Sequence, residues 1–202
     1  MSFVWKSARP VVIAIFALLA AASPAVAQKQ MPQKQVFTVN PAQSKVDFTL
    51  GDVLHTVHGT FALKPGSIEF DSATGAASGE LVVDAGSGDS GNGARDRKMK
   101  KEILETQKFP DITFTARKIT GNVASQGASQ ILVDGLMNLH GDSHPVTLAM
   151  EVNVKPGLAS ADTTFVVPYV KWGLKNPSTF LLKVSDKVDI NVHAVGKLNP
   201  AN

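Results

Sequence analysis

Apolar and polar residues alternate along most of the chain from Val36 onward. In the segment 146–154 (VTLAMEVNV), every second residue is apolar and most of the residues between them are polar. A period of two places alternate side chains on the same face of a β-strand. The same alternation is found in the segments 44–50, 57–63, 67–70, 111–116 and 187–195. The pattern predicts roughly eight strands, each with one face directed into the protein.

Short turn signals separate these strands. Sequences rich in glycine, proline, aspartate or asparagine occur at 64–66, 71–75, 120–122, 140–142 and 155–157, and such sequences are typical of tight turns. Many short strands joined by hairpins form either an antiparallel sandwich or a closed barrel. Because closure leaves no unpaired edge strand, we expect an all-β fold, an antiparallel eight-stranded barrel.

One charged segment, from Arg95 to Phe114 (RDRKMKKEILETQKFPDITF), interrupts the alternation. Its basic residues suggest a helix that binds nucleic acid. Of the 20 lysines and arginines in the sequence, however, two lie in the first 27 residues, which leaves 18 against 17 acidic residues. A net charge of about +1 argues against a nucleic-acid-binding protein. The six bases of the segment are Arg95, Arg97, Lys98, Lys100, Lys101 and Lys108.

The same segment has the pattern of a short amphipathic helix. Met99 and Ile103 are four residues apart, with Leu104 beside them, so that one face is apolar and the other charged. We predict a helix at about 94–108 that lies on an apolar surface and covers one part of the barrel. Its expected local signals are an N-cap at Ser90 or Asn92, an ion pair between Asp96 and Lys100, and a stop at Pro110.

The N-terminus has the three parts of a secretory signal peptide. Lys6 and Arg9 precede an apolar run, and the triplet Ala-Val-Ala at 25–27 resembles a cleavage site. The apolar run is shorter than the roughly 18 to 20 residues of a spanning helix. We therefore expect residues 1–27 to be a signal peptide and residues 28–202 to be a single periplasmic or secreted domain without stable membrane insertion. The sequence contains no cysteine, which excludes disulfides and thiolate metal sites.

Motifs for catalysis are few. The sequence has no glycine-rich phosphate loop, no GxSxG elbow and no HExxH. His55 and His58 are three apart, which places them on opposite faces of a strand. His140, Asp142 and His144 share one predicted hairpin loop, and such a set binds zinc or iron in some proteins. We expect no enzyme activity, no catalytic residue, no metal site and no cofactor, and keep a metal-dependent periplasmic enzyme using His140 and His144 as an alternative.

Several sequence blocks together resemble the YceI family, which are secreted bacterial proteins with a lipocalin-like barrel that bind polyisoprenoid lipids. Their order and spacing carry the resemblance over nearly the whole chain after residue 27. Two positions depart from the family pattern, since Lys98 stands near the usual histidine of its helix and Gln43 near the usual histidine of its first strand pair. The blocks are FTVNPAQSKVDFTL, VHGTFALKPGSIEFD, RDRKMKK followed by KFPDITFTA, VDGLMNLHGDSHPVTLAMEV, and KWGLKNP before LKVSDKVDINVHA.

The resemblance implies a hydrophobic tunnel that holds a long isoprenoid-type lipid, with a quinone or an amide among the candidate head groups, for transport, storage or sequestration. The expected partner is this lipid and not nucleic acid, and a homodimer is left open. The residues alone leave a second alternative, a stress-related structural module with a filled core, because eight-stranded barrels are either filled or hold one ligand. Tyr169 and Trp172 are expected at the rim, since such side chains suit a boundary between lipid and water. The expected lining residues are Phe48, Leu50, Phe61, Ile68, Phe70, Met99, Ile103, Phe114, Leu148, Met150, Phe165, Trp172, Ile190 and Val192.

Overall fold

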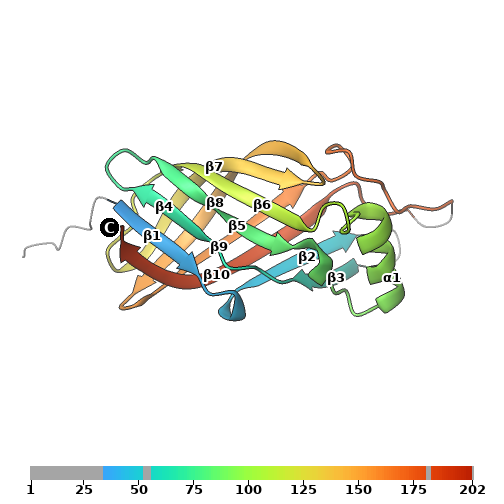
Figure 1. Cartoon of the computed structure of the whole chain (residues 1–202), viewed down its shortest axis with the longest axis horizontal. Coiled ribbons are helices and arrows are strands. Elements are labelled where there is room, and N and C mark those ends of the chain that lie inside the picture. The colour runs from blue at the N-terminus through green and yellow to red at the C-terminus, as the bar shows by residue number, and fades with distance from the viewer. Residues whose placement is uncertain (1–33, 52–55, 181–182, 202) are drawn as a thin grey trace, which may run out of the picture.

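The computed structural model describes residues 34–51, 56–180 and 183–201 (Figure 1). The expected signal peptide, residues 1–27, lies outside the described residues. No helix within the described ranges has the length and hydrophobicity needed to cross a membrane.

The described residues contain ten strands and four short helical elements, the last two of which are continuous with each other. Every strand pairing is antiparallel. The strands are β1 (Lys34–Val39), β2 (Lys45–Gly51), β3 (Thr56–Phe61), β4 (Ser67–Asp71), β5 (Ala77–Asp84), β6 (Asp111–Thr120), β7 (Gly127–Leu139), β8 (Asp142–Lys155), β9 (Leu158–Val167) and β10 (Val188–Pro200). The helical elements are η1 (Pro41–Gln43), η2 (Ala85–Ser87), α1 (Gly93–Lys98) and the π-helical turn η3 (Met99–Ile103).

The strands close into a barrel of eight positions. The order is β1-β4-β5-β6-β7-β8-β9-β10, and β1 also pairs with β10. β10 pairs with β2 through its first half and with β1 through its last residues, so β1 and β2 are two parts of one interrupted strand. β3 and β4 are likewise two parts of one interrupted strand, because β3 pairs with β2 and β4 pairs with β1. The predicted antiparallel eight-stranded barrel is confirmed.

The interruption between β3 and β4 corresponds to the Lys-Pro-Gly sequence at 64–66, which joins two parts of one strand and not two hairpin strands. Pro65 has no N–H to donate to a sheet. A Cβ on Gly66 would lie 2.6 Å from the Glu80 carbonyl oxygen of β5, so the strands approach here more closely than a side chain allows. Leu63 and Val83 still form a bridge beside the bend, which keeps the wall continuous.

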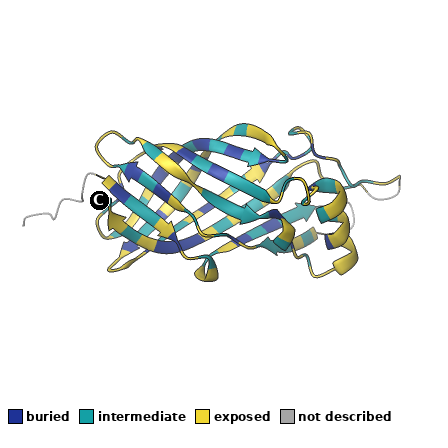
Figure 2. Ribbon diagram, viewed as in Figure 1, coloured by how far each residue is buried: buried dark blue, intermediate teal, exposed yellow. Residues whose placement is uncertain are grey.

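Side chains alternate between the interior and the surface along the strands, visible as bands of buried and exposed residues in Figure 2. In β7, Ile131, Val133, Gly135, Met137 and Leu139 are buried and the residues between them are more exposed. The end of the barrel near the C-terminus is filled by a large apolar cluster, and the other end is covered by α1 and η3 (Figure 1). The filled cluster comprises Ile68, Phe70, Phe114, Ala116, Ile119, Val123, Ile131, Val133, Leu148, Val152, Val154 and Ala159.

Candidate functional site

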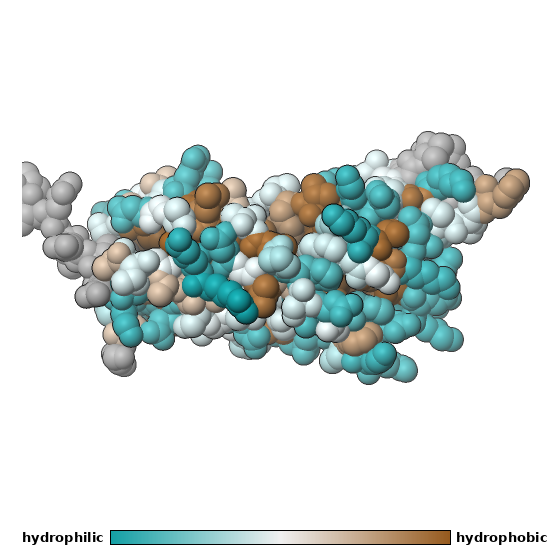
Figure 3. All heavy atoms as spheres, turned by 90° about the horizontal axis from the view of Figure 1, so that it is seen from above, coloured by the Kyte–Doolittle hydropathy of each residue, from teal (hydrophilic) through white to brown (hydrophobic). Residues whose placement is uncertain are grey.

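A cavity of about 260 Å³ occupies the half of the barrel under α1 and η3. Its walls are almost wholly apolar and come from the strands, the covering helix and the loop that follows β9. In Figure 3 the outer surface at this end is mostly hydrophilic, with a few apolar patches between the hydrophilic residues. The lining residues are Val46, Phe48, Leu50, Val57, Phe61, Leu63, Leu81, Val83, Ser90, Arg95, Lys98, Met99, Ile103, Leu104, Ile112, Thr113, Phe114, Met137, Leu139, Leu148, Met150, Thr163, Phe165, Val167, Tyr169, Leu174, Pro177, Val188, Ile190 and Val192.

The two halves of the interior differ in how well their side chains are covered. In the filled half, Ala116 and Ala159 are each only 2% exposed. In the hollow half, the inward-facing Leu50, Ile190 and Val192 are only half-buried. β2 and β10 place these residues there because Phe48 pairs with Ile190 and Val46 with Val192. Inward apolar side chains that are only partly covered by their neighbours leave space for an apolar ligand.

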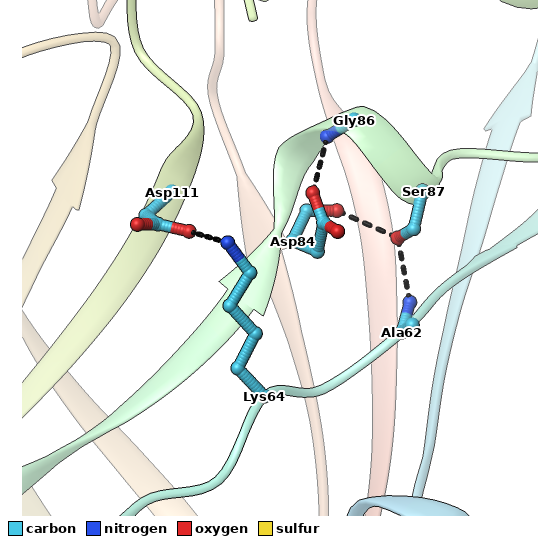
Figure 4. Close-up of polar contacts among 6 residues, drawn as sticks. All are labelled: Ala62, Lys64, Asp84, Gly86, Ser87 and Asp111. Carbon is cyan, nitrogen blue, oxygen red and sulfur yellow. Dashed lines mark hydrogen bonds and ion pairs between the residues drawn. The ribbon is translucent and has the colours of Figure 1, made fainter.

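The cavity is covered by the long connection between β5 and β6, residues 85–110, called here the covering segment. Its two ends meet, since the N–H of Ala85 donates to the carbonyl of Pro110 at 2.9 Å. Figure 4 shows how its first turn is fixed: Asp84 accepts from the N–H of Gly86, and the Ser87 hydroxyl donates to the Asp84 carbonyl and accepts from the N–H of Ala62. The segment is thus attached to β5 and to the chain that follows β3.

The covering segment also completes the barrel wall beside β3. β3 pairs with β2 along one edge, and on its other edge Thr60 exchanges two backbone hydrogen bonds with Asp89, of 2.8 and 3.0 Å. Phe61 and Met99 then meet at Gly88, where a Cβ would lie 2.5 Å from Met99 Cε and 2.7 Å from the Phe61 ring. A side chain at position 88 would therefore have to displace the ends of the Met99 and Phe61 side chains, which pack over this glycine.

The helix lies with its apolar face on the cavity, as the helical spacing of Met99, Ile103 and Leu104 predicts. Asn92 is its N-cap and accepts from the N–H groups of Ala94 and Arg95, which confirms one of the two predicted caps. The length was predicted wrongly, since helical structure ends at Ile103 and not near 108.

The early end has a local cause. Glu105 adopts a positive φ of 46°, and the N–H of Thr106 bonds back to the carbonyl of Lys100. A left-handed residue with such a bond terminates a helix. The expected pair of Asp96 with Lys100 is also wrong, because Asp96 is buried and accepts hydrogen bonds from the N–H and hydroxyl of Ser90.

Polar residues border the cavity mainly at Ser90 and at the first turns of the helix. Arg95 and Lys98 contribute to the almost wholly apolar lining through the aliphatic parts of their side chains, and both residues are exposed to solvent. The Arg95 guanidinium donates from Nε to the Ser90 hydroxyl and from Nη2 to the Ser90 carbonyl, both at 2.7 Å. This part of the lining is therefore the mouth of the cavity, where the apolar wall meets water.

The loop after β9 forms another part of the wall, where Tyr169 and Leu174 share one apolar cluster with Leu104. Tyr169, Leu174 and Pro177 line the cavity. Tyr169 is buried, its hydroxyl donates to the Ser185 carbonyl at 2.6 Å, and burial, helped by the charge of Asp186, raises the pKa of its phenol above 10.0. Trp172 does not line the cavity; its ring stacks on His144 with the centroids 4.1 Å apart.

Most of the residues expected to line a tunnel surround the cavity. The structure brings together Phe48, Leu50, Phe61, Met99, Ile103, Phe114, Leu148, Met150, Phe165, Ile190 and Val192. It places Ile68 and Phe70 in the filled half, where neighbouring side chains occupy the space they face, and Trp172 against His144. Among the residues that the sequence did not single out, Val46, Val57 and Leu63 follow the same strand alternation. Ser90, Leu174 and Pro177 lie in irregular segments that give no periodic signal, and Arg95 and Lys98 lie on the helix α1 outside its apolar stripe.

The two histidines of the β7–β8 turn lie in separate surroundings. His140 contacts Phe109 at a ring distance of 4.4 Å, and its Nε2 is 3.3 Å from Glu105 Oε2. His144 instead stacks on Trp172. Across the described ranges, no three His, Cys, Asp or Glu side chains are grouped as a metal site would require. The predicted hairpin is present, but it does not bring the two rings and Asp142 together.

Known proteins resemble this chain in parts of its sequence and in its fold. UPF0312 proteins of Vibrio vulnificus (strain YJ016) and Yersinia enterocolitica are 30% identical over 119 residues and 34% identical over 94 residues. The alignments span 57% and 46% of this chain, and 61% and 46% of those proteins, so the chain matches only about half to three-fifths of these relatives' length.

Solved structures share the barrel at lower identity. BcnA of Burkholderia cenocepacia superposes with a TM-score of 0.63 at 21% identity, over 79% of this chain and 99% of that one. A polyisoprenoid binding domain from Saccharophagus degradans superposes with a TM-score of 0.61 at 13% identity, over 84% of this chain and 100% of that one. The YCEI protein of Campylobacter jejuni superposes with a TM-score of 0.59 at 18% identity, over 71% of this chain and 86% of that one. At such identities the likeness shows the fold alone.

A defined domain covers most of the described chain. Residues 37–196, from β1 to the C-terminal part of β10, match the YceI-like domain. With the closed barrel and its covered cavity, this match shows that the chain belongs to the YceI-like family.

Proposed function

We propose that the protein binds one long-chain isoprenoid-type lipid in the cavity and carries or sequesters it. The observation that supports this most directly is the hollow, apolar half of a barrel whose other half is filled. Burial of an aliphatic chain contributes about 0.8 kcal/mol per CH2. Such a ligand therefore needs apolar walls and few directional contacts, which is what the lining supplies.

The family relation supports the same ligand class and a binding role. A relative in fold from Saccharophagus degradans is described as a polyisoprenoid binding domain. The arrangement of residues around the cavity offers apolar contacts and no paired acid and base, so we propose binding without catalysis. The signal-like pattern of residues 1–27 favours export, so we place this role in the periplasm or outside the cell.

The test is recovery of the ligand from the protein. We would express the full chain in a Gram-negative host, purify it from the envelope extract without detergent, and analyse it by native mass spectrometry and lipid extraction. Val192→Trp would fill the cavity from β10. Val166→Trp is the matched control, because Val166 is 52% exposed on the outside of β9.

The expected result is a stoichiometric isoprenoid-type lipid on the wild type and on Val166→Trp, and its loss from Val192→Trp. Wild-type protein that is free of lipid and does not take up isoprenoid alcohols added to it would refute the proposal. Equal lipid content in the two tryptophan variants would show that any bound lipid lies outside this cavity.

A further inference from the structure

We propose that Arg95 and Lys98 bind an anionic head group, a phosphate or diphosphate, at the mouth of the cavity. The inference deepens the proposed function and rests on it, because the head group is the polar end of the lipid whose tail fills the barrel. It names the ligand class as isoprenoid phosphates, in place of neutral isoprenoid alcohols or quinones.

The first observation is the position of these two cations. The helix carries Arg95, Arg97, Lys98, Lys100 and Lys101, and of these only Arg95 and Lys98 are part of the cavity lining. They are three residues apart, so their side chains lie on one face of the helix. Their aliphatic stems border the cavity, and their charged ends, which are exposed to solvent, lie at its mouth, where the head group of a bound lipid would be.

The second observation is the way Arg95 is held. Two hydrogen bonds of 2.7 Å run from Nε and Nη2 to Ser90. Ser90 is fixed in turn by Asp96, which accepts from its N–H at 3.0 Å and from its hydroxyl at 2.5 Å. The guanidinium is thus oriented before any ligand binds, and pre-orientation reduces the entropy lost on binding.

The third observation is that no carboxylate pairs directly with these charges. Within the described residues, no carboxylate lies within 4.0 Å of Arg95 or Lys98. Asp96, the acidic residue nearest in sequence, is linked to Arg95 only through the Ser90 hydroxyl, which accepts from Arg95 and donates to Asp96. Hydrogen bonds to Ser90 use Nε and Nη2, which leaves the Nη1 amino group of Arg95 for an acceptor.

The chemistry of the pair selects the head group. A planar guanidinium with several N–H donors matches the oxygens of a phosphate, and a nearby ammonium adds a second positive charge. An alcohol or a quinone carbonyl offers one neutral acceptor and gains little from two cations. The site therefore favours a dianionic head at the end of an apolar chain.

The experiment compares ligands that share a four-isoprene tail: geranylgeraniol, geranylgeranyl phosphate and a naphthoquinone bearing the same tail. Delipidated full-length protein is titrated with each at low ionic strength, and inorganic phosphate is titrated alone as the head without a tail. The site variant is Arg95→Gln with Lys98→Gln. The control is Arg97→Gln with Lys101→Gln, which removes the same charge from exposed positions outside the lining.

Wild type and control should bind the phosphate at least tenfold more tightly than the alcohol or the quinone, and should bind inorganic phosphate only weakly. The site variant should bind all three lipids with about the affinity that the wild type has for the alcohol. Lys98→Gln alone, which leaves the Ser90 contacts in place, should lose part of the preference; this guards against a loss caused by misfolding.

Equal wild-type affinity for the phosphate and the alcohol, or a preference for the quinone, would overturn the proposal and leave the proposed function standing. A phosphate preference that survives in the site variant would also overturn it. Absence of binding for all three lipids would overturn both. Tight binding of inorganic phosphate by itself would assign the site to a free anion and not to a lipid head group.

Discussion

The Lys64 ammonium lies 2.5 Å from the Asp111 carboxylate, which joins the bend between β3 and β4 to the first residue of β6. Asp111 is paired with Asp84 across the β5–β6 ladder, so two carboxylates flank the first and last residues of the covering segment. Figure 4 shows Lys64 reaching Asp111 beside the turn that begins the segment. The hydrogen bond to Asp111, with a smaller contribution from Asp84, raises the pKa of Lys64 above 10.5.

We expect Lys64→Met to lower the free energy of unfolding by a small amount at neutral pH, since it leaves two carboxylates facing each other. A lysine whose pKa is raised by folding stabilises the folded state fully below its usual value of 10.5. That contribution is lost as the pH rises through the raised pKa. Urea midpoints of wild type and variant should therefore converge in strongly alkaline buffer, and a difference that stays constant across the pH series would contradict the role of the charge.

Gly59→Ala should detach the covering segment from β3. A Cβ at Gly59 would lie 2.5 Å from the Asp89 carbonyl oxygen and would also collide with the Phe48 ring. Overpacking of this kind costs about 1 to 3 kcal/mol. Chemical denaturation measures that loss, and amide exchange at Thr60 and Asp89 should become faster.

Gly51→Ala is the control for this change, because no atom of the described residues lies within 4 Å of a Cβ at Gly51. It should change the stability by only a few tenths of a kcal/mol. If both alanine variants were equally stable, the close contact of β3 with the covering segment would have no energetic consequence.

Alternation along the sequence was enough to predict the barrel and most of its inner face. It failed where the strands carry few large apolar residues. In β9 the inward positions include Ala159, Ala161 and Thr163, and in β7 the alternation is broken by Gly135. A Cβ at Gly135 would lie 2.6 Å from the Phe114 ring, so an aromatic residue of the neighbouring strand occupies that place.

The division of the interior into a filled and a hollow half could not be read from alternation. Phe70 and Phe48 have the same pattern in sequence, yet Phe70 lies in the filled cluster and Phe48 lines the cavity. The difference depends on which strands and loops meet across the barrel. Arg95 and Lys98 were missed as lining residues for a related reason, because the orientation of a covering helix is set by contacts distant in sequence.

Tyr169→Phe should destabilise the loop after β9, which forms part of the cavity wall. The phenol is buried and donates to the Ser185 carbonyl at 2.6 Å, so its removal leaves a carbonyl without that partner. A lost hydrogen bond of this type costs about 1 to 2 kcal/mol. Thermal denaturation and the dissociation rate of bound lipid measure the change; unchanged stability would mean that water replaces the phenol at no cost.

Replacement of both His140 and His144 by alanine should leave lipid content unchanged and remove no metal. His140 lies against Phe109, and His144 lies against Trp172. Elemental analysis of protein purified without chelators, before and after the change, tests the enzyme alternative. Stoichiometric zinc or iron on the wild type that disappears from the double variant would reinstate a metal-dependent role.

The apolar face of the helix should control retention of the ligand more strongly than its exposed charges do. Met99 and Ile103 line the cavity, whereas Arg97 and Lys101 are exposed and do not. Met99→Asp with Ile103→Asp puts two carboxylates against an apolar ligand, and burying an unpaired charge is strongly unfavourable. The charged helix should move away from the barrel or take in water, and either response exposes the tail of the lipid.

The measurement is the dissociation rate of a prebound isoprenoid lipid, followed by transfer to vesicles. We expect an increase of tenfold or more for the aspartate variant and less than twofold for Arg97→Gln with Lys101→Gln. Far-ultraviolet circular dichroism establishes that the barrel is intact in both variants, since β3 and β10 do not depend on the helix for their ladder with β2. Equal rates in the two variants would mean that the helix covers the cavity without retaining its ligand.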